Sequence, residues 1–178
     1  MHSLGRNFLG AEGAAALAPA LAANGSLTSL DLSNNQLCGV TGWYGTYTAE
    51  GITAIADALR VNGGLTSIDL SGNQLCGIWT DQNGYQNGTY TAEGITAIAD
   101  ALRVSGSLTT LDLSSNYLMD EGVSAVCKAI QSNKETKLAS LNFGVNKIGP
   151  VGANALVAMV AVTGSLTQVL ATRDSDAP

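Results

Sequence analysis

The chain is 178 residues long, with 46% hydrophobic and 12% charged residues and a formal net charge of −6. This composition is typical of a globular domain with one continuous core, and no apolar run approaches the ~20 residues that a membrane-spanning helix requires. The eight Lys and Arg residues are scattered along the chain, which makes nucleic acid and anionic membrane surfaces poor partners. Because the first residues lack a basic and then apolar leader, we expect a cytoplasmic protein.

In chain order, one pattern of apolar and polar residues recurs. A fragment at residues 4–9 opens the chain, and an Ala-rich predicted helix follows at residues 14–23. Residues 27–37 then read LTSLDLSNNQL, in which apolar and polar residues alternate. A period of two predicts a strand with one buried face.

A predicted helix follows each strand. Ile52, Ile55 and Leu59 fall on one face at helical spacing. One strand and one helix cannot bury both apolar faces alone, so the units must stack, and the helix supplies the crossover that parallel strands need. The sequence therefore predicts an α/β solenoid. The later strand segments lie at residues 65–75, 108–118, 138–148 and 166–171.

The pattern L-x-x-L-x-L-x-x-N-x-L closely resembles the leucine-rich repeat family, and the Gly-x-x-x-(Leu/Ile)-Ala-x-x-Leu helix, as in residues 51–59, resembles its ribonuclease-inhibitor-like branch. The resemblance implies a right-handed horseshoe with parallel strands on the concave face and helices on the convex face. It also implies a role in protein–protein recognition rather than catalysis, and a ladder of buried Asn amides that bond the turns after the strands. The ladder residues are Asn7, Asn35, Asn73, Asn116 and Asn146.

We expect one domain over residues 1–178. Neither end carries an evident polar capping repeat, so we expect self-association through the ends, unless the tail after residue 171 folds back as a cap. The predicted units are a partial repeat at 1–26, repeats at 27–64, 65–107, 108–137 and 138–165, and a terminal partial repeat at 166–178.

Two neighbouring units are longer than the rest. Successive ladder Asn residues are separated by 28 residues in the first unit but by 38 and 43 in the next two, which leaves insertions of 10 (38 − 28) and 15 (43 − 28) residues. We place them between strand and helix, at residues 38–48 and 76–91, so they project from one rim of the horseshoe. Residues 45–61 and 88–104 are identical, which indicates an internal duplication.

The two insertions hold six of the nine aromatic residues. Tyr and Trp on a background of Gly, Thr and Asn resemble the composition of antibody binding loops, where rigid rings supply contact area at low entropic cost. Tyr47 and Tyr90 lie in the duplicated stretch, and we expect them to pack. An alternative is that the insertions only pack on each other, with Trp43 stacked on Trp79. The predicted partner-binding aromatics are Trp43, Tyr44, Trp79 and Tyr85.

An acidic stripe is a second candidate binding surface. Asp31, Asp69 and Asp112 occupy the same place in three neighbouring strands, which would set them ~4.8 Å apart on the concave face. Neighbouring carboxylates would repel by roughly 3 kcal/mol at an effective dielectric near 20, so the stripe would favour a cationic side chain or a metal ion in front of it. Asn142 and Leu170 interrupt the stripe. The alternative is that Asp is simply a solvated residue at this strand position.

Candidates for catalysis and metal binding are few. Cys38 and Cys76 occupy equivalent places after the ladder, where either a disulfide or two small buried thiols is conceivable, and Cys127 is expected in the core. A metal site at the two thiols lacks its other ligands. His2 is the single histidine, and no phosphate loop or zinc pattern occurs. We expect no cofactor, no metal and no enzymatic activity.

The sequence therefore predicts a protein-interaction module that binds an unknown protein through the aromatic rim loops, the acidic concave face, or both. The main alternative is a structural, array-filling repeat with no fixed partner. A more remote alternative is a regulator of small GTPases, a role that some ribonuclease-inhibitor-like repeat proteins have.

Overall fold

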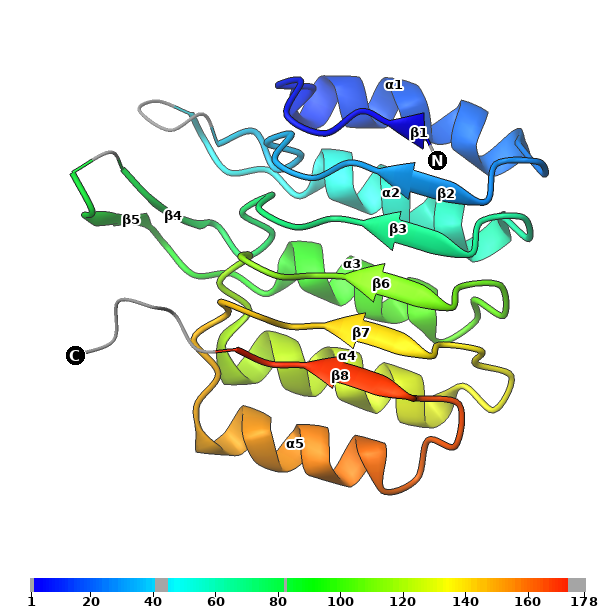
Figure 1. Cartoon of the computed structure of the whole chain (residues 1–178). Coiled ribbons are helices and arrows are strands. Elements are labelled where there is room, and N and C mark those ends of the chain that lie inside the picture. Colours follow the sequence, from blue (N-terminus) through cyan, green and yellow to red (C-terminus); the bar gives the residue numbers. More distant parts are fainter. Residues whose placement is uncertain (1, 41–44, 82, 173–178) are drawn as a thin grey trace.

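The computed structural model describes residues 2–40, 45–81 and 83–172 (Figure 1). Short strands alternate with helices along the chain. The strands of the main sheet are β1 (His2–Ser3), β2 (Ser29–Asp31), β3 (Ser67–Asp69), β6 (Thr110–Asp112), β7 (Ser140–Asn142) and β8 (Gln168–Leu170). They lie in this order, and every neighbouring pair is parallel.

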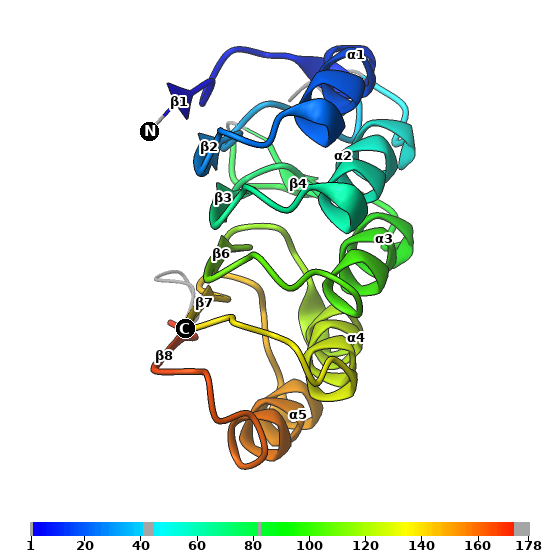
Figure 2. The same cartoon turned by 90° about the vertical axis from the view of Figure 1, so that its right-hand side faces the viewer.

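The helices form a second layer behind the sheet. Figure 2 shows the two layers edge-on, with the strands on the inner side of an arc and the helices on its outer side. The predicted α/β solenoid is therefore confirmed. No helix of the described segments is both long and apolar enough to cross a bilayer. The helices are α1 (Gly10–Ala23), α2 (Glu50–Val61), α3 (Glu93–Leu102), α4 (Met119–Ser132) and α5 (Pro150–Val160).

The core lies between the two layers and runs the length of the stack. Leu30 is paired in register with Ile68, Ile68 with Leu111, and Leu111 with Leu141, and all four side chains are buried. Burial of each such side chain contributes roughly 1.5–3 kcal/mol. Because each unit covers the apolar edge of its neighbour, the stack forms one continuous core.

The strands β1, β2, β3, β6 and β7 each leave the sheet through a turn centred on an Asn. The residues before and after this Asn both have positive φ angles, for example 53° at Asn34 and 57° at Gln36. Left-handed backbone is uncommon outside glycine, so a turn with two such residues requires other bonds to hold it. The Asn side chain supplies those bonds, as described below.

The second insertion is a hairpin rather than an irregular loop. Strands β4 (Ile78–Thr80) and β5 (Gln86–Gly88) pair antiparallel and project from the rim where the main strands end (Figure 1). The run Ile-Trp-Thr has the β-branched and aromatic residues that favour strands. The spacing of the Asn residues located this insertion, but its strands were not predicted, because the run is only three residues long.

Candidate partner-binding surfaces

The hairpin holds Trp79 in a defined position. Trp79 lies opposite Asn87 in the hairpin register and is half-buried. Its ring lies over Gly88, since a Cβ atom on that glycine would lie 2.5 Å from the indole Cζ3 atom. Gly88 has a φ of 89°, so both its backbone and the space above it require glycine.

The tip of the hairpin is built around Asp81. Its Oδ1 atom accepts hydrogen bonds from the backbone N–H groups of Asn83 and Tyr85, each at 2.9 Å. The Asn87 side chain donates to the Tyr85 carbonyl at 2.9 Å. These bonds fix the backbone while the Tyr85 side chain remains 71% exposed. Tyr85 is therefore an exposed ring on an ordered support.

The next two units brace the hairpin at the end of β4 that adjoins its tip. The hydroxyl groups of Thr80 and Tyr117 are hydrogen-bonded, and the Lys147 ammonium group lies 5.1 Å from the centre of the Tyr117 ring. A cation at this distance from an aromatic face is attracted to it. The hairpin is thus tied to the turns that follow β6 and β7.

Tyr47 and Tyr90 anchor the ends of the two insertions. The Tyr47 hydroxyl donates to the Leu75 carbonyl at 3.0 Å and accepts from the Gly94 N–H at 3.1 Å, so it bonds the first turn of α3. The Tyr90 hydroxyl donates to the Leu118 carbonyl at 3.0 Å. Burial raises the pKa of both tyrosines, and the neighbouring cysteines add to the effect.

Trp43 and Tyr44 lie outside the described residues, so the stacking of Trp43 on Trp79 stays a prediction. The two insertions do approach each other through another ring. A Cβ atom on Gly77 would lie 3.4 Å from a Tyr47 ring atom, which places the end of the first insertion against the start of the second.

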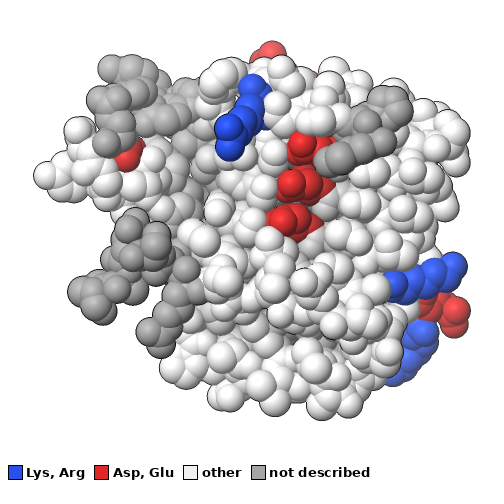
Figure 3. Space-filling model, viewed as in Figure 1, with Lys and Arg blue, Asp and Glu red and all other residues white. Residues whose placement is uncertain are grey.

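The three aspartates of the predicted stripe lie in register. Asp31 is paired with Asp69, and Asp69 with Asp112. Figure 3 shows their carboxylates as a row on the concave face. In each case an Oδ1 atom accepts a hydrogen bond from the backbone N–H two residues later, at 2.8–2.9 Å. Each aspartate therefore also accepts a hydrogen bond from the backbone just after its strand ends.

The remaining carboxylate oxygens of the stripe differ in their partners. Asp31 Oδ2 accepts from the Ser3 hydroxyl at 2.7 Å, and Asp112 Oδ2 accepts from the Asn142 side chain at 2.7 Å. Burial raises the pKa of Asp31, but the hydrogen bonds from Ser3 and Ser33 and the charge of Arg6 outweigh this, so that its pKa lies below the ordinary value. The acidic stripe therefore ends at Asn142, whose uncharged side chain donates a hydrogen bond to Asp112.

Neither the stripe nor the cysteines forms a metal site in the described part of the chain, where no group of three or more His, Cys, Asp or Glu side chains is placed to hold an ion. Cys38, Cys76 and Cys127 are free and buried. The disulfide that the sequence left open is therefore not formed. Burial raises the pKa of each thiol to about 12, so the thiolate needed for nucleophilic or metal chemistry is scarce near pH 7.

The ladder asparagines bond in one continuous series, here called the strand-exit ladder. The backbone N–H of each donates to the side-chain oxygen of the next, at 2.9–3.0 Å. From Asn35 onward, each side-chain nitrogen also donates to a carbonyl in the preceding unit, at 2.8–3.0 Å. The interior members are buried, whereas the first is exposed. The members are Asn7, Asn35, Asn73, Asn116 and Asn146.

A second series, which the sequence analysis missed, lies where the helices end; we call it the helix-exit ladder. Asn62 donates to the carbonyls of Leu21 and Asn24, at 2.6 and 2.8 Å, and its oxygen accepts from the Leu65 N–H at 2.7 Å. Asn133 makes the two equivalent donor bonds, to the carbonyls of Leu102 and Ser105 in the unit before it, each at 2.8 Å. The available signal was an Asn three residues before the Leu that opens the strand motif, at Asn24 and Asn62.

Comparison with known proteins supports a leucine-rich repeat protein. Residues 26–43 match a family model described as Leucine Rich Repeat, and residues 105–127 match a second leucine-rich repeat model. No curated protein sequence matches the chain. Among the 51 chains of solved structures that match is one from the crystal structure of a TLR13–ssRNA13 complex. The two sequences are 19% identical, and the TM-score is 0.40. The match covers 86% of this chain but only 20% of the chain in that complex.

Proposed function

We propose that the chain is a protein-interaction module whose main contact surface is the β4–β5 hairpin. Leucine-rich repeat domains are generally protein-interaction modules, and the observation that carries this proposal is the exposed ring of Tyr85 on a hairpin fixed within its turn by Asp81 and at the adjoining end of β4 by Tyr117. An aromatic side chain on an ordered backbone loses little entropy on binding, so it is well suited to anchor a partner.

The acidic concave face is a second part of the proposed contact surface. Asp31 and Asp112 each use both oxygens within the chain, whereas Asp69 has a single bond to the Ser71 N–H among the described residues. The second oxygen of Asp69 is thus the member of the stripe available to a Lys or Arg of a partner. Charged groups at such a position mainly affect the association rate and partner choice.

Affinity capture followed by quantitative mass spectrometry tests the hairpin proposal. The wild-type chain is compared with Tyr85→Ala and with the control Phe8→Ala, because these aromatic residues are 71% and 74% exposed but lie in different parts of the rim. We expect at least one protein that the wild type and Phe8→Ala retain and Tyr85→Ala loses by about tenfold or more. Equal recovery by all three folded chains would contradict the proposal.

The finer family assignment is also a proposal. We propose a ribonuclease-inhibitor-like repeat, on the basis of full helices of 10–14 residues after the strands and of the Gly-x-x-x-(Leu/Ile)-Ala-x-x-Leu pattern in α1, α2 and α3. A cytoplasmic location is proposed because the three cysteines are unpaired, as is usual in a reducing compartment.

One observation favours the alternative of an array-forming structural repeat. Several apolar side chains of α5 are exposed, with Val151, Val157 and Val160 at 65%, 70% and 50% exposure. Exposed apolar side chains gathered on one helix favour association with a further apolar surface. Sedimentation at several concentrations tests this. A concentration-dependent increase in mass that Val157→Lys abolishes would support the alternative, and a strict monomer would exclude it.

A further inference from the structure

The helix-exit ladder is interrupted between α3 and β6. Ser105 stands where Asn62 and Asn133 stand in the neighbouring units, and it is only 7% exposed. Among the described residues, the Ser105 hydroxyl has no hydrogen-bond partner. A buried polar group without a partner costs roughly 1–3 kcal/mol, so this hydroxyl requires an explanation.

A pocket opens at this interruption, with a volume of about 450 Å³. It lies between the turn that follows α2 and the turn that follows α3, and its wall also includes Lys137 from the segment before β7. The charged residues in the wall are Arg60 and Lys137, and no acidic residue lines it. The pocket therefore combines two cations with a buried hydroxyl that has no partner.

Backbone N–H groups near Ser105 also lack acceptors among the described residues. In the unit with Asn62, the side-chain oxygen accepts from the N–H groups of Gly64 and Leu65. The corresponding N–H groups in the Ser105 unit belong to Ser107 and Leu108, and within residues 2–40, 45–81 and 83–172 neither has a hydrogen-bond acceptor. Ser107 lines the pocket, so its N–H adds a donor.

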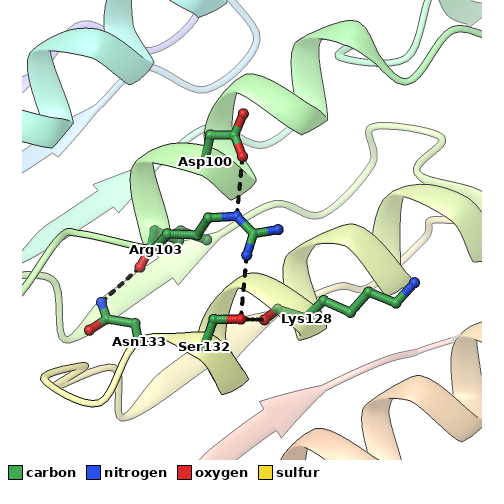
Figure 4. Close-up of polar contacts among 6 residues, drawn as sticks. Asp100, Arg103, Lys128, Ser132 and Asn133 are labelled. Atoms are coloured by element: carbon green, nitrogen blue, oxygen red, sulfur yellow. Dashed lines mark hydrogen bonds and ion pairs between the residues drawn. The ribbon is translucent and has the colours of Figure 1, made fainter.

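The duplication provides an internal comparison for Arg60. Arg103, its counterpart in the identical segment, donates to Asp100 at 3.2 Å and to the Ser132 hydroxyl at 3.3 Å (Figure 4). At the place of Ser132, the unit that follows Arg60 has Val104, which cannot accept a hydrogen bond. Arg60 has no ion pair among the described residues. It is therefore the arginine available to a ligand.

We propose that this pocket binds a small oxyanion, such as a phosphate or carboxylate group, through Arg60, Lys137, the Ser105 hydroxyl and the Ser107 N–H. Each of these groups offers a proton or a positive charge, which matches an acceptor with several oxygens. The C-terminal carbonyls of α2 and α3 lie nearby and oppose a negative charge. Both cations therefore contribute to binding, and the affinity is expected to be millimolar.

A second interruption serves as a natural control. Thr163 occupies the ladder position before β8, and a pocket of about 170 Å³ opens there as well. The Ser165 hydroxyl in its wall has no partner, but Lys134 is the one cation that lines it. An interruption alone thus opens a pocket, and the pair of cations distinguishes the Ser105 pocket.

The test is a titration of the full chain with inorganic phosphate and, separately, with acetate at constant ionic strength. Backbone ¹H–¹⁵N NMR shifts are followed at Ser105, Gly106 and Ser107. We expect saturable shifts at these amides in at least one titration, and the comparison of the two identifies which group the pocket prefers. Shifts that stay linear in both titrations would overturn the proposal.

Three variants sharpen this test. Arg60→Gln should weaken binding by about fivefold, the loss typical of one charge-assisted contact, whereas Arg103→Gln should leave it unchanged. Ser105→Asn should remove the unpaired hydroxyl, pair the Ser107 N–H within the chain and abolish binding, while the chain stays folded and at least as stable. Equal effects of the two arginine variants, or phosphate binding that persists in folded Ser105→Asn, would show that the shifts arise from unspecific attraction.

Discussion

The strand-exit ladder and the helix-exit ladder lie at opposite edges of the sheet and use the same side chain. Asn73 in the first and Asn62 in the second both donate to two or more carbonyls and accept from backbone N–H groups. The strand-exit ladder has an Asn in each of the first five units, whereas the helix-exit ladder has Ser105 and Thr163 in two of its places.

The difference follows from the backbone that each ladder supports. The turns of the strand-exit ladder have two residues of positive φ around each Asn, and their N–H groups point at the next unit. The helix-exit turns have an ordinary extended backbone at Asn62, with φ −74° and ψ 116°. A strained turn requires its side-chain bonds, while an extended turn tolerates their loss and leaves a pocket.

The largest effect is expected for Asn73→Ala. This change removes donors to Leu32 and Leu70 at 2.9 and 3.0 Å and the acceptor of the Asn35 N–H, all of them buried. Several unpaired buried groups should lower the free energy of unfolding by roughly 3 kcal/mol or more. Chemical denaturation measures it. Asn7→Ala is the control, because Asn7 is exposed and water can replace its bonds, so its loss should be under ~1 kcal/mol. Equal losses of stability in the two variants would show that buried and exposed members of the strand-exit ladder contribute alike.

A smaller loss is expected for Asn62→Ala in the other ladder. Its bonds to Leu21 and Asn24 join α1 to the following unit, but the turn retains an unstrained backbone. We expect a decrease of roughly 1–2 kcal/mol in the free energy of unfolding, measured under the conditions used for Asn73→Ala. A loss as large as that of Asn73→Ala would show that both ladders are equally essential.

Repair of the interruption should stabilise the chain. In Ser105→Asn the new amide is placed to bond carbonyls of the preceding unit, as Asn62 and Asn133 do, and its oxygen to accept from the Ser107 N–H. We expect a gain of about 1 kcal/mol, seen as a higher denaturation midpoint. Ser105→Ala is the control. It removes the unpartnered hydroxyl without supplying an amide, so it should change stability by less than ~0.5 kcal/mol. A destabilised Ser105→Asn would mean that the pocket cannot accommodate the longer side chain.

The sequence was sufficient to predict the solenoid because the signal repeats. Alternation around Leu30, Ile68, Leu111 and Leu141 marks a strand in each unit, and a period repeated several times is far stronger than any single segment. The location of the insertions followed from the spacing of the Asn residues. These features depend on local pattern and counting alone.

The details of the sites depend on contacts between units, which no local pattern encodes. The anchoring of Tyr47 on Gly94 joins residues 47 positions apart, and the bond between Thr80 and Tyr117 joins residues 37 apart. The pocket at Ser105 depends on Lys137 from a later unit. The helix-exit ladder was missed because the turn after α4 is longer, so Asn133 is five rather than three residues before its Leu.

The smallest predicted effect concerns backbone strain within the strand-exit ladder. Val145 precedes Asn146 with a φ of 55°, while Gly72 occupies the same place before Asn73 with a φ of 66°. A β-branched residue in this region is strained by roughly 1–3 kcal/mol, which exceeds the ~0.5–1 kcal/mol by which glycine favours the unfolded chain. Val145 is 42% exposed, so its replacement removes little packing, and its N–H bond to the Thr172 carbonyl at 3.0 Å is a backbone bond that glycine keeps.

We therefore expect Val145→Gly to raise the free energy of unfolding by about 0.5–1 kcal/mol, once the lost side-chain contacts are subtracted. The reverse exchange, Gly72→Val, should lower it, because a Cβ atom there would lie 2.4 Å from the Asn34 side-chain oxygen in addition to the backbone strain. Opposite signs for this pair would show that the ladder turns carry conformational strain which the Asn bonds offset. A loss of stability in Val145→Gly would instead show that the valine side chain contributes more by packing than its backbone costs, and the contrast between strained and unstrained turns would no longer explain why one ladder is complete.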